Sequence, residues 1–269
     1  MKVAALPLDI KLGQKHENLI AAAERLRFVE PDTDVVVLPE TFTTGFIGSR
    51  ERMAELAETV DGHTMDDVHR WASFFKMAIA GSFVARDKSG THLYNRAFFI
   101  EPSGDETFYD KHHLFINGED SVFTPGEMTP PRIRYMGWDF ALGVCYDIRF
   151  PGWLRNRDPH YDVLLLPANW PEKRRYAWDT LLRARAIENI AYVVGANRSG
   201  EANLMEVIGK PAAPPVMEEY QADSSVILDF AGHSIGTMSP HGIIHATLDR
   251  DALSKMRRHL PALDAIDSI

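Results

Sequence analysis

The sequence predicts an α/β fold with a mixed β-sheet, and two patterns support this prediction. Apolar segments of strand length alternate with segments of helix length over residues 3–38 and again over 162–195, which is typical of parallel strands joined by helices. A polar, glycine-containing loop at 87–90 separates two apolar segments, 78–85 and 92–100, which indicates an antiparallel hairpin. The fold is therefore expected to contain both parallel and antiparallel strands.

The N-terminal part of the chain is expected to begin with a strand at 3–8 and a helix at 15–29, whose apolar residues recur on one face. An all-apolar strand follows at 35–38, and such strands are usually buried on both faces. Thr64 and Asp67 have the spacing of a capping box, so a second helix is expected to begin there.

The segment around the only cysteine is apolar from Ala141 to Cys145 and then becomes polar, which predicts a buried strand ending at a tight corner. It is preceded by a short strand at 107–110 and by a loop at 112–131 without periodicity, and loops of this length are often functional. The remaining elements are expected in this order: a short helix at 152–157, a strand at 162–166, a helix at 172–190, a strand at 192–195, an irregular insertion at 199–219, strands at 224–229 and 241–248, and a helix at 252–259.

Composition limits the classes of protein that the chain can belong to. Its 269 residues are 45% hydrophobic, which is enough for one domain over residues 1–269. The net charge of −9 argues against binding to nucleic acid or to anionic membranes and favours a small-molecule partner. Pro7, Asp9 and Lys11 interrupt the first apolar run, so no signal peptide is expected. A single unpaired cysteine suits a reducing cytoplasm.

Glu40, Lys111 and Cys145 share one feature, because each ends or closely follows a predicted strand. In open α/β sheets ligands bind beyond the carboxyl ends of strands, so these side chains are expected to meet in one crevice. A thiol with a pKa of about 8.5 is mostly protonated at neutral pH and needs a base. Glu40 can accept this proton, and Lys111 and the backbone N–H of Tyr146 can stabilise an oxyanion. Taken singly, each residue also fits an ordinary role as a core cysteine or a solvated charge.

Three segments resemble the catalytic blocks of the nitrilase superfamily of carbon-nitrogen hydrolases and occur in the same order: LPETFTTGF at 38–46, YDKHHLF at 109–115 and VCYDIRFP at 144–151. The later segments 161–171, 182–189 and 192–198 look like further blocks of the family, so the resemblance covers most of the chain. Within the superfamily, the TTGF and ANWP combinations are most similar to bacterial omega-amidases, which act on 2-oxoglutaramate and 2-oxosuccinamate.

The resemblance implies a four-layer α-β-β-α sandwich with mixed sheets and a Glu-Lys-Cys mechanism that needs no metal or other cofactor. In this mechanism Glu40, Lys111 and Cys145 are catalytic, and an acyl group is carried as a cysteinyl thioester. Glu119 matches a second glutamate that helps to position the lysine, although a solvated loop residue is the alternative for it. The resemblance also implies a homodimer or a larger homo-oligomer. The side chains or backbone groups that it places around the oxyanion and the substrate are those of Phe42, Tyr146, Asn169 and Trp170.

An omega-amide substrate with a distal carboxylate needs a cationic or donor-rich partner. Arg149, Arg174, Arg175 and Trp170 follow predicted strands closely enough to be candidates. Each arginine can equally pair with a nearby carboxylate, and for Arg149 we expect such a structural ion pair, for example with Asp147.

Other functions remain open at this stage. An N-carbamoyl amino acid amidohydrolase, an aliphatic amidase or a nitrilase would use the same three catalytic residues. A cysteine protease with a Cys-His pair could instead use His112 or His113 as its base. A metal-binding module around His241 and His245 and a non-catalytic binding protein are alternatives of other classes, although no complete zinc pattern is present.

Overall fold

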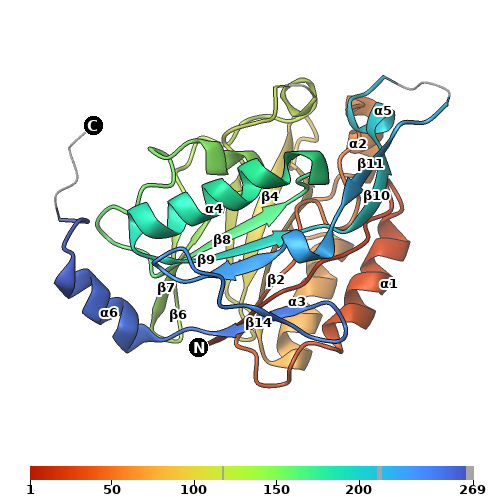
Figure 1. Cartoon of the computed structure of the whole chain (residues 1–269). Helices are drawn as coiled ribbons and strands as arrows, with labels where there is room; N and C mark the ends of the chain where they lie inside the picture. Colours follow the sequence, from red (N-terminus) through yellow and green to blue (C-terminus); the bar gives the residue numbers. More distant parts are fainter. Residues whose placement is uncertain (117, 211–213, 265–269) are drawn as a thin grey trace.

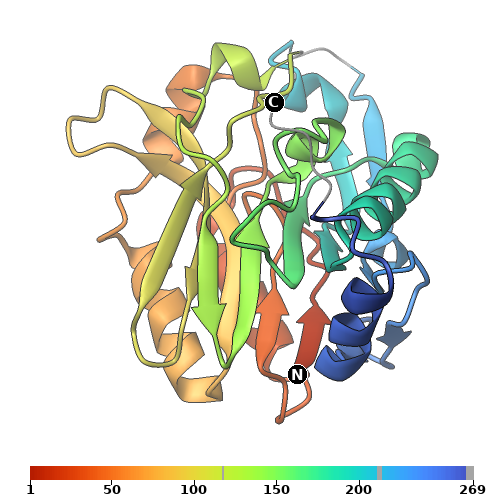
Figure 2. The same ribbon diagram turned by 90° about the vertical axis from the view of Figure 1, so that its left-hand side faces the viewer.

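The computed structural model of the chain describes residues 1–116, 118–210 and 214–264. Two β-sheets pack face to face and helices cover their outer faces, so the layers follow the order α-β-β-α (Figures 1 and 2). The predicted α/β sandwich with mixed sheets is confirmed. No helix within the described ranges is both long enough and apolar enough to cross a lipid bilayer.

The larger sheet has seven strands in the order β13-β14-β1-β2-β3-β4-β5. Its centre is parallel, because β1 pairs with β2 and β2 with β3 in parallel, whereas the outer pairs are antiparallel. The strands are β1 (Lys2–Ala5), β2 (Val35–Val37), β3 (Ala78–Arg86), β4 (Leu93–Ile100), β5 (Glu106–Asp110), β13 (Thr237–Met238) and β14 (Ile244–Thr247). The predicted hairpin corresponds to β3 and β4.

The smaller sheet has five strands in the order β12-β9-β8-β7-β6. Here β7, β8 and β9 are parallel, and the two edge strands run antiparallel to them. The strands are β6 (Arg132–Tyr135), β7 (Trp138–Leu142), β8 (Val163–Ala168), β9 (Tyr192–Asn197) and β12 (Val226–Leu228).

Alternation along the central strands explains why they are apolar throughout. Ala5 and Val37 belong to the core shared with the smaller sheet, whereas their neighbours Ala4 and Val36 belong to the core beneath the helices. Successive side chains in a strand point to opposite faces, so burial on both faces requires a continuous apolar run. The prediction that the second strand is buried on both faces is therefore confirmed.

The helices occupy both outer layers (Figure 1). Helices α1 (Lys15–Leu26) and α3 (His63–Phe75) contribute their apolar faces to the core outside the larger sheet. Helix α4 (Arg175–Asn189) covers the smaller sheet through residues such as Trp178. Two shorter helices are α2 (Arg50–Leu56) and α6 (Arg250–His259).

Several local predictions were wrong for identifiable reasons. Helix α3 begins at His63 with Gly62 as its N-cap, so Thr64 lies inside the first turn and does not cap the helix. The side chain of Glu58 accepts the backbone N–H of Thr64 instead. The expected helix at 152–157 is a turn. The expected strand end at Cys145 is also wrong, since β7 ends at Leu142 and Cys145 begins a 3₁₀ turn, Cys145–Arg149.

The insertion at 199–219 is not irregular. It contains an antiparallel ribbon of β10 (Gly200–Asn203) and β11 (Met217–Tyr220), with the short helix α5 (Leu204–Val207) after β10. Residues 211–213 of the insertion lie outside the described residues. Both strands are short and rich in polar residues, so they lack the apolar pattern by which a buried strand is predicted. Figure 1 shows this ribbon projecting beside α2 at one end of the sandwich.

Candidate active site

The predicted catalytic residues come from the ends of different strands. Glu40 follows β2, Lys111 follows β5 directly and Cys145 follows β7. The structure brings these three side chains to the lining of one pocket. Glu119 belongs to a 3₁₀ turn, Glu119–Ser121, in the loop after Lys111, and it lines the same pocket.

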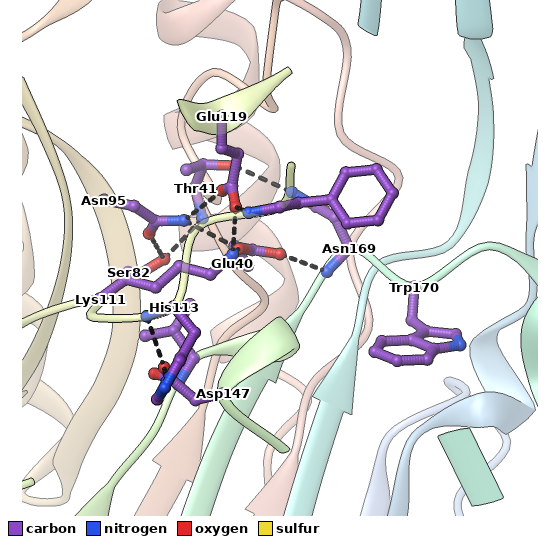
Figure 3. A network of polar contacts seen from close by, with 12 residues as sticks. Glu40, Thr41, Ser82, Asn95, Lys111, His113, Glu119, Asp147, Asn169 and Trp170 are labelled. Atoms are coloured by element: carbon purple, nitrogen blue, oxygen red, sulfur yellow. Dashed lines mark hydrogen bonds and ion pairs between the residues drawn. The ribbon is translucent and has the colours of Figure 1, made fainter. Parts of the chain in front are cut away.

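The ammonium group of Lys111 connects two carboxylates. Its Nζ donates to Glu40 Oε1 at 2.8 Å and to Glu119 Oε2 at 2.6 Å (Figure 3). The side chain of Lys111 is only 1% exposed, so water does not screen these ion pairs effectively. An ammonium group has three N–H donors, and one therefore remains for a group bound in the pocket.

Asn95 on β4 forms a second bridge between the same carboxylates, and sequence analysis missed it. Its Nδ2 donates to Glu40 Oε1 at 2.8 Å and to Glu119 Oε1 at 3.1 Å, while its Oδ1 accepts from the Ser82 hydroxyl (Figure 3). Asn95 is fully buried, at a strand position between the buried residues Leu93 and Ala97. A buried polar residue requires partners, and this requirement was the signal available in the sequence.

The second oxygen of Glu40 is held by the loop after β8. Glu40 Oε2 accepts the backbone N–H of Asn169 at 2.8 Å. The side-chain Nδ2 of Asn169 donates to the Thr41 hydroxyl oxygen at 2.9 Å. Its Oδ1 is buried and has no hydrogen-bond partner within the part of the chain that the structure describes. Asn169 therefore fixes the orientation of Glu40 and is itself one of the residues that line the pocket.

Cys145 lies in a strained turn that the buried carboxylate of Asp147 stabilises. The φ of Cys145 is 43°, and such a conformation costs about 1–3 kcal/mol in a non-glycine residue. The backbone N–H of Val144 donates to Asp147 Oδ2 at 3.0 Å, and the N–H of Asp147 donates to the Val144 carbonyl at 2.9 Å. Asp147 also accepts from the Tyr109 hydroxyl and from the backbone of His113. These bonds fix the turn that presents the sulfur.

The electrostatics of the pocket define the protonation states of the thiol and the amine. Burial, followed by the negative charge of Glu40, raises the pKa of the Cys145 thiol well above its ordinary value. Burial disfavours the ammonium form of Lys111, but the carboxylates of Glu119 and Glu40 outweigh it and raise the pKa well above the ordinary value. At neutral pH the site thus holds a neutral thiol and a charged amine. Burial also raises the pKa of Glu119, with Glu40 adding to the shift and Lys111 opposing it.

The pocket is a cavity of about 250 Å³. Its lining combines the polar catalytic groups and several cationic side chains with aromatic and aliphatic ones. The lining residues are Glu40, Phe46, Lys111, Phe115, Glu119, Cys145, Tyr146, Arg149, Asn169, Trp170, Pro171, Lys173, Arg174, Arg198, Leu204, Val207, Ile208, Glu218 and Tyr220. The predicted binding residues Tyr146, Asn169 and Trp170 are among them.

Phe42 does not line the pocket, so the prediction that it lies beside the substrate was wrong. Its side chain is fully buried in the core outside the larger sheet, where its ring lies edge-on to those of Trp71 and Phe98. Phe46 from the same loop lines the pocket instead.

The histidines do not support the two alternatives that depend on them, a cysteine protease and a metal-binding module. His112 bonds to the carbonyl of Gly126, His113 bonds to Asp147, and neither lines the pocket. His241 lies before β14 and stacks on Phe28. Across the described ranges, no group of three or more His, Cys, Asp or Glu side chains could hold a metal ion.

The three arginines that were candidates for binding a substrate carboxylate differ in their surroundings. Arg175 bonds to Asp179 at 3.2 Å and to Asp223 at 2.8 Å, and it does not line the pocket. The expected ion pair of Arg149 is wrong for the residues that the structure describes, because its guanidinium lies 5.2 Å from the ring centroid of Trp170 and pairs with no carboxylate. Arg149 and Arg174 both line the pocket.

Comparison with known sequences shows similarity over nearly the whole chain. The family described as carbon-nitrogen hydrolase matches residues 6–258. "Omega-amidase YafV" of Escherichia coli strain K12 is 38% identical over 240 residues, which cover 87% of this chain and 84% of that protein. "2-oxoglutaramate amidase" of Bacillus subtilis is 28% identical over 275 residues, which cover 98% of this chain and 96% of that protein.

Comparison with solved structures gives the same picture. XC1258 from Xanthomonas campestris, described as a CN-hydrolase superfamily protein with an arsenic adduct in its active site, has a TM-score of 0.87 and 31% identity, and the match covers 100% of this chain and 98% of that one. Nit3 from Saccharomyces cerevisiae, described as a member of the nitrilase superfamily, shares the fold with a TM-score of 0.80 at 24% identity, over 97% of this chain and 94% of that one.

Proposed function

The chain belongs to the carbon-nitrogen hydrolase family and is an enzyme that acts on amides, and on this premise we propose that it is an omega-amidase. Its substrates would be the omega-amides of small 2-oxo dicarboxylic acids, namely 2-oxoglutaramate and 2-oxosuccinamate, which it converts to the acid and ammonia. The names of two relatives support this substrate class. The observation that carries the proposal is the Lys111 ammonium group held by Glu40 and Glu119 in the pocket that Cys145 lines.

The first half-reaction forms a thioester. Because the pKa of Cys145 is raised, the thiol is protonated at rest, and Glu40 accepts its proton while the sulfur attacks the amide carbonyl carbon. The remaining N–H of Lys111 and the backbone N–H of Tyr146 stabilise the oxyanion. The carbon–nitrogen bond then breaks as protonated Glu40 gives its proton to the leaving nitrogen, and ammonia departs.

The second half-reaction hydrolyses the thioester. Glu40, again ionised, takes a proton from water while the oxygen attacks the thioester carbon. The carbon–sulfur bond breaks, the sulfur recovers the proton from Glu40, and the carboxylic acid leaves. Glu119 and Asn95 take no proton and hold Glu40 and Lys111 in position.

Asn169 is suited to orient the substrate amide. A buried acceptor without a partner costs about 1–3 kcal/mol, and the Oδ1 of Asn169 is such an atom among the described residues. An N–H of the substrate amide would satisfy it while the backbone N–H of the same residue holds Glu40.

Ammonia release from a panel of substrates tests the proposed function. The panel contains 2-oxoglutaramate, 2-oxosuccinamate, N-carbamoyl amino acids, simple aliphatic amides and nitriles, with the Cys145→Ala variant as the background control. The 2-oxo omega-amides are expected to give the highest kcat/KM. Turnover of carbamoyl compounds without turnover of 2-oxo amides would show that the subfamily assignment is wrong.

We further propose that the enzyme is one domain over residues 1–269, acts in the cytoplasm and forms a homodimer or larger homo-oligomer. Its only cysteine, Cys145, is free, which suits a reducing compartment. Tyr176 and Ile187 on α4 are 85% and 54% exposed, and this outer helix is the surface that we propose for contact between subunits. Light scattering of the purified protein measures the oligomeric state.

A further inference from the structure

Three consecutive cationic residues after the strand β8 have different partners. Lys173 forms an ion pair with Glu218 on β11. Arg175 forms ion pairs with Asp179 and Asp223. Arg174, which lies between them and lines the pocket, has no carboxylate partner among the residues that the structure describes. Its charge is thus not neutralised within the described protein.

Arg174 is held at the pocket wall by contacts that leave its N–H groups available. Its guanidinium carbon lies 5.1 Å from the ring centroid of Phe115, and a guanidinium stacked on a ring can still donate from its edge. Its backbone carbonyl accepts the indole N–H of Trp170 at 2.8 Å. The backbone N–H of Phe115 donates to Glu119 Oε2 at 2.8 Å. Phe115 therefore contacts both Arg174 and Glu119, and Glu119 is one of the two carboxylates that hold Lys111.

Two other cations of the pocket are already engaged. Lys111 bonds to Glu40 and Glu119. The guanidinium of Arg198 bonds to the backbone carbonyls of Ile10 and Glu201, and it lies 4.5 Å from the ring centroid of Tyr220. Lys111 is thus committed to the catalytic carboxylates, and Arg198 is only 1% exposed and held by backbone carbonyls, so both are less accessible to the substrate carboxylate than Arg174.

Arg149 is the remaining candidate and differs from Arg174 in exposure. Its side chain is exposed, whereas that of Arg174 is partly buried. An exposed guanidinium is solvated and screened by salt. A partly buried one interacts more strongly with an anion because its surroundings are less polarisable. Arg174 is therefore the better site for a bidentate contact with a carboxylate.

Resting on the proposed function, we propose that Arg174 binds the carboxylate of the substrate and determines which amides the pocket accepts. The protein has a net charge of −9, which includes the carboxylates of Glu40, Glu119 and Glu218 in the pocket lining. Lys111 and Lys173 are paired with these carboxylates. An anionic substrate needs a local cation to enter such a site. The guanidinium of Arg174 supplies this cation, so amides with a distal carboxylate are preferred over neutral amides.

The test compares Arg174→Gln with Arg175→Gln, a matched variant of the adjacent arginine that lies off the pocket. For 2-oxoglutaramate, kcat/KM of Arg174→Gln is expected to fall about 100-fold, mainly through KM, because a desolvated charge contact is lost. Arg174→Lys is expected to recover part of the loss. Arg175→Gln is expected to stay near the wild-type value.

A second readout separates substrate binding from damage to the site. Alkylation of Cys145 by iodoacetamide, a neutral probe, is expected to proceed at the wild-type rate in Arg174→Gln, because the neutral probe does not need the cation. Slowed alkylation together with a lowered melting temperature would indicate a structural role and overturn the assignment.

The failures of the two proposals are distinguishable. If the wild-type enzyme hydrolyses 2-oxoglutaramate and Arg174→Gln keeps its kcat/KM, the assignment of Arg174 is wrong and the proposed function stands. If Arg149→Gln shows the large loss instead, the carboxylate belongs to Arg149. A wild-type enzyme that is inert toward all 2-oxo amides overturns the proposed function and this inference with it.

Discussion

Asn95 donates its side-chain amide to Glu40 Oε1 at 2.8 Å, from β4, a strand that contributes no residue to the pocket lining. The same side-chain amide also donates a hydrogen bond to Glu119 Oε1. Two carboxylates that would otherwise repel each other are therefore held together by a neutral donor as well as by the ammonium group of Lys111.

Replacement of Asn95 by alanine is expected to lower activity without removing any reacting group. Loss of hydrogen bonds to a buried charged group costs about 1–3 kcal/mol, so kcat should fall roughly 10- to 100-fold. Steady-state kinetics of ammonia release measure this effect. Ser82→Ala, which removes the group that bonds to Asn95 Oδ1, serves as the milder comparison, and equal losses in both variants would contradict a direct role for Asn95.

Removal of the sulfur is expected to abolish turnover and preserve the fold. Cys145→Ala should give no ammonia above background, because no other thiol is present in the chain. Cys145→Ser should be nearly as inert, since a hydroxyl ionises far less readily than a thiol. Activity and melting temperature are measured together. Substantial turnover by the folded alanine variant would rule out a covalent mechanism.

Replacement of Glu40 by glutamine is expected to separate turnover from thiol ionisation. The negative charge of Glu40 contributes to the raised pKa of Cys145, so removal of this charge lowers that pKa. The variant should lose ammonia release and yet form thiolate at a lower pH than the wild type. Thiolate absorbance against pH reports on Cys145 alone, because it is the only cysteine. An unchanged or raised pKa would show that Glu40 does not act on the thiol through its charge.

Replacement of Lys111 by methionine is expected to destabilise the fold in a pH-dependent way. It leaves Glu40 and Glu119 buried without their counter-ion, and removal of one partner of a buried ion pair costs about 3–5 kcal/mol. Lys111 lowers the pKa of Glu119 in the wild type, so the variant should have a still higher Glu119 pKa. A carboxyl whose pKa is higher in the folded state than in the unfolded state binds its proton more tightly when folded, so stability increases as pH falls through that pKa.

Thermal unfolding at several pH values measures this effect. The melting temperature of Lys111→Met is expected to rise on acidification relative to that of the wild type over the range in which Glu119 protonates. A variant with the same pH dependence as the wild type would contradict the electrostatic role assigned to Lys111.

The sequence allowed the central part of the fold and the base of the pocket to be predicted, for a simple physical reason. Strands buried on both faces are continuous apolar runs, and the polar residues that interrupt them at their ends are conspicuous. Glu40, Lys111 and Cys145 are of this kind, and the structure places all three at one pocket.

Other parts depended on contacts between distant segments and could not be predicted in this way. Asn95 meets Glu40 and Glu119 only through contacts between segments that are distant in the chain, and Ser82 on the neighbouring strand β3 donates to its Oδ1. Whether Arg149 and Arg174 form ion pairs depends on which carboxylates lie near them in the folded chain. The ribbon of β10 and β11 is too short and too polar for its periodicity to indicate strands.

The strand ends supply the reacting groups of the pocket and the β10–β11 ribbon supplies part of its wall, and this division has an evolutionary consequence. The reacting groups stand at the ends of the two large sheets, whereas Leu204, Val207, Glu218 and Tyr220 belong to the α5 segment and the β10–β11 ribbon. Natural variation in the β10–β11 ribbon can thus reshape one part of the pocket wall while the reacting groups and Arg174, which lie on other segments, keep their positions.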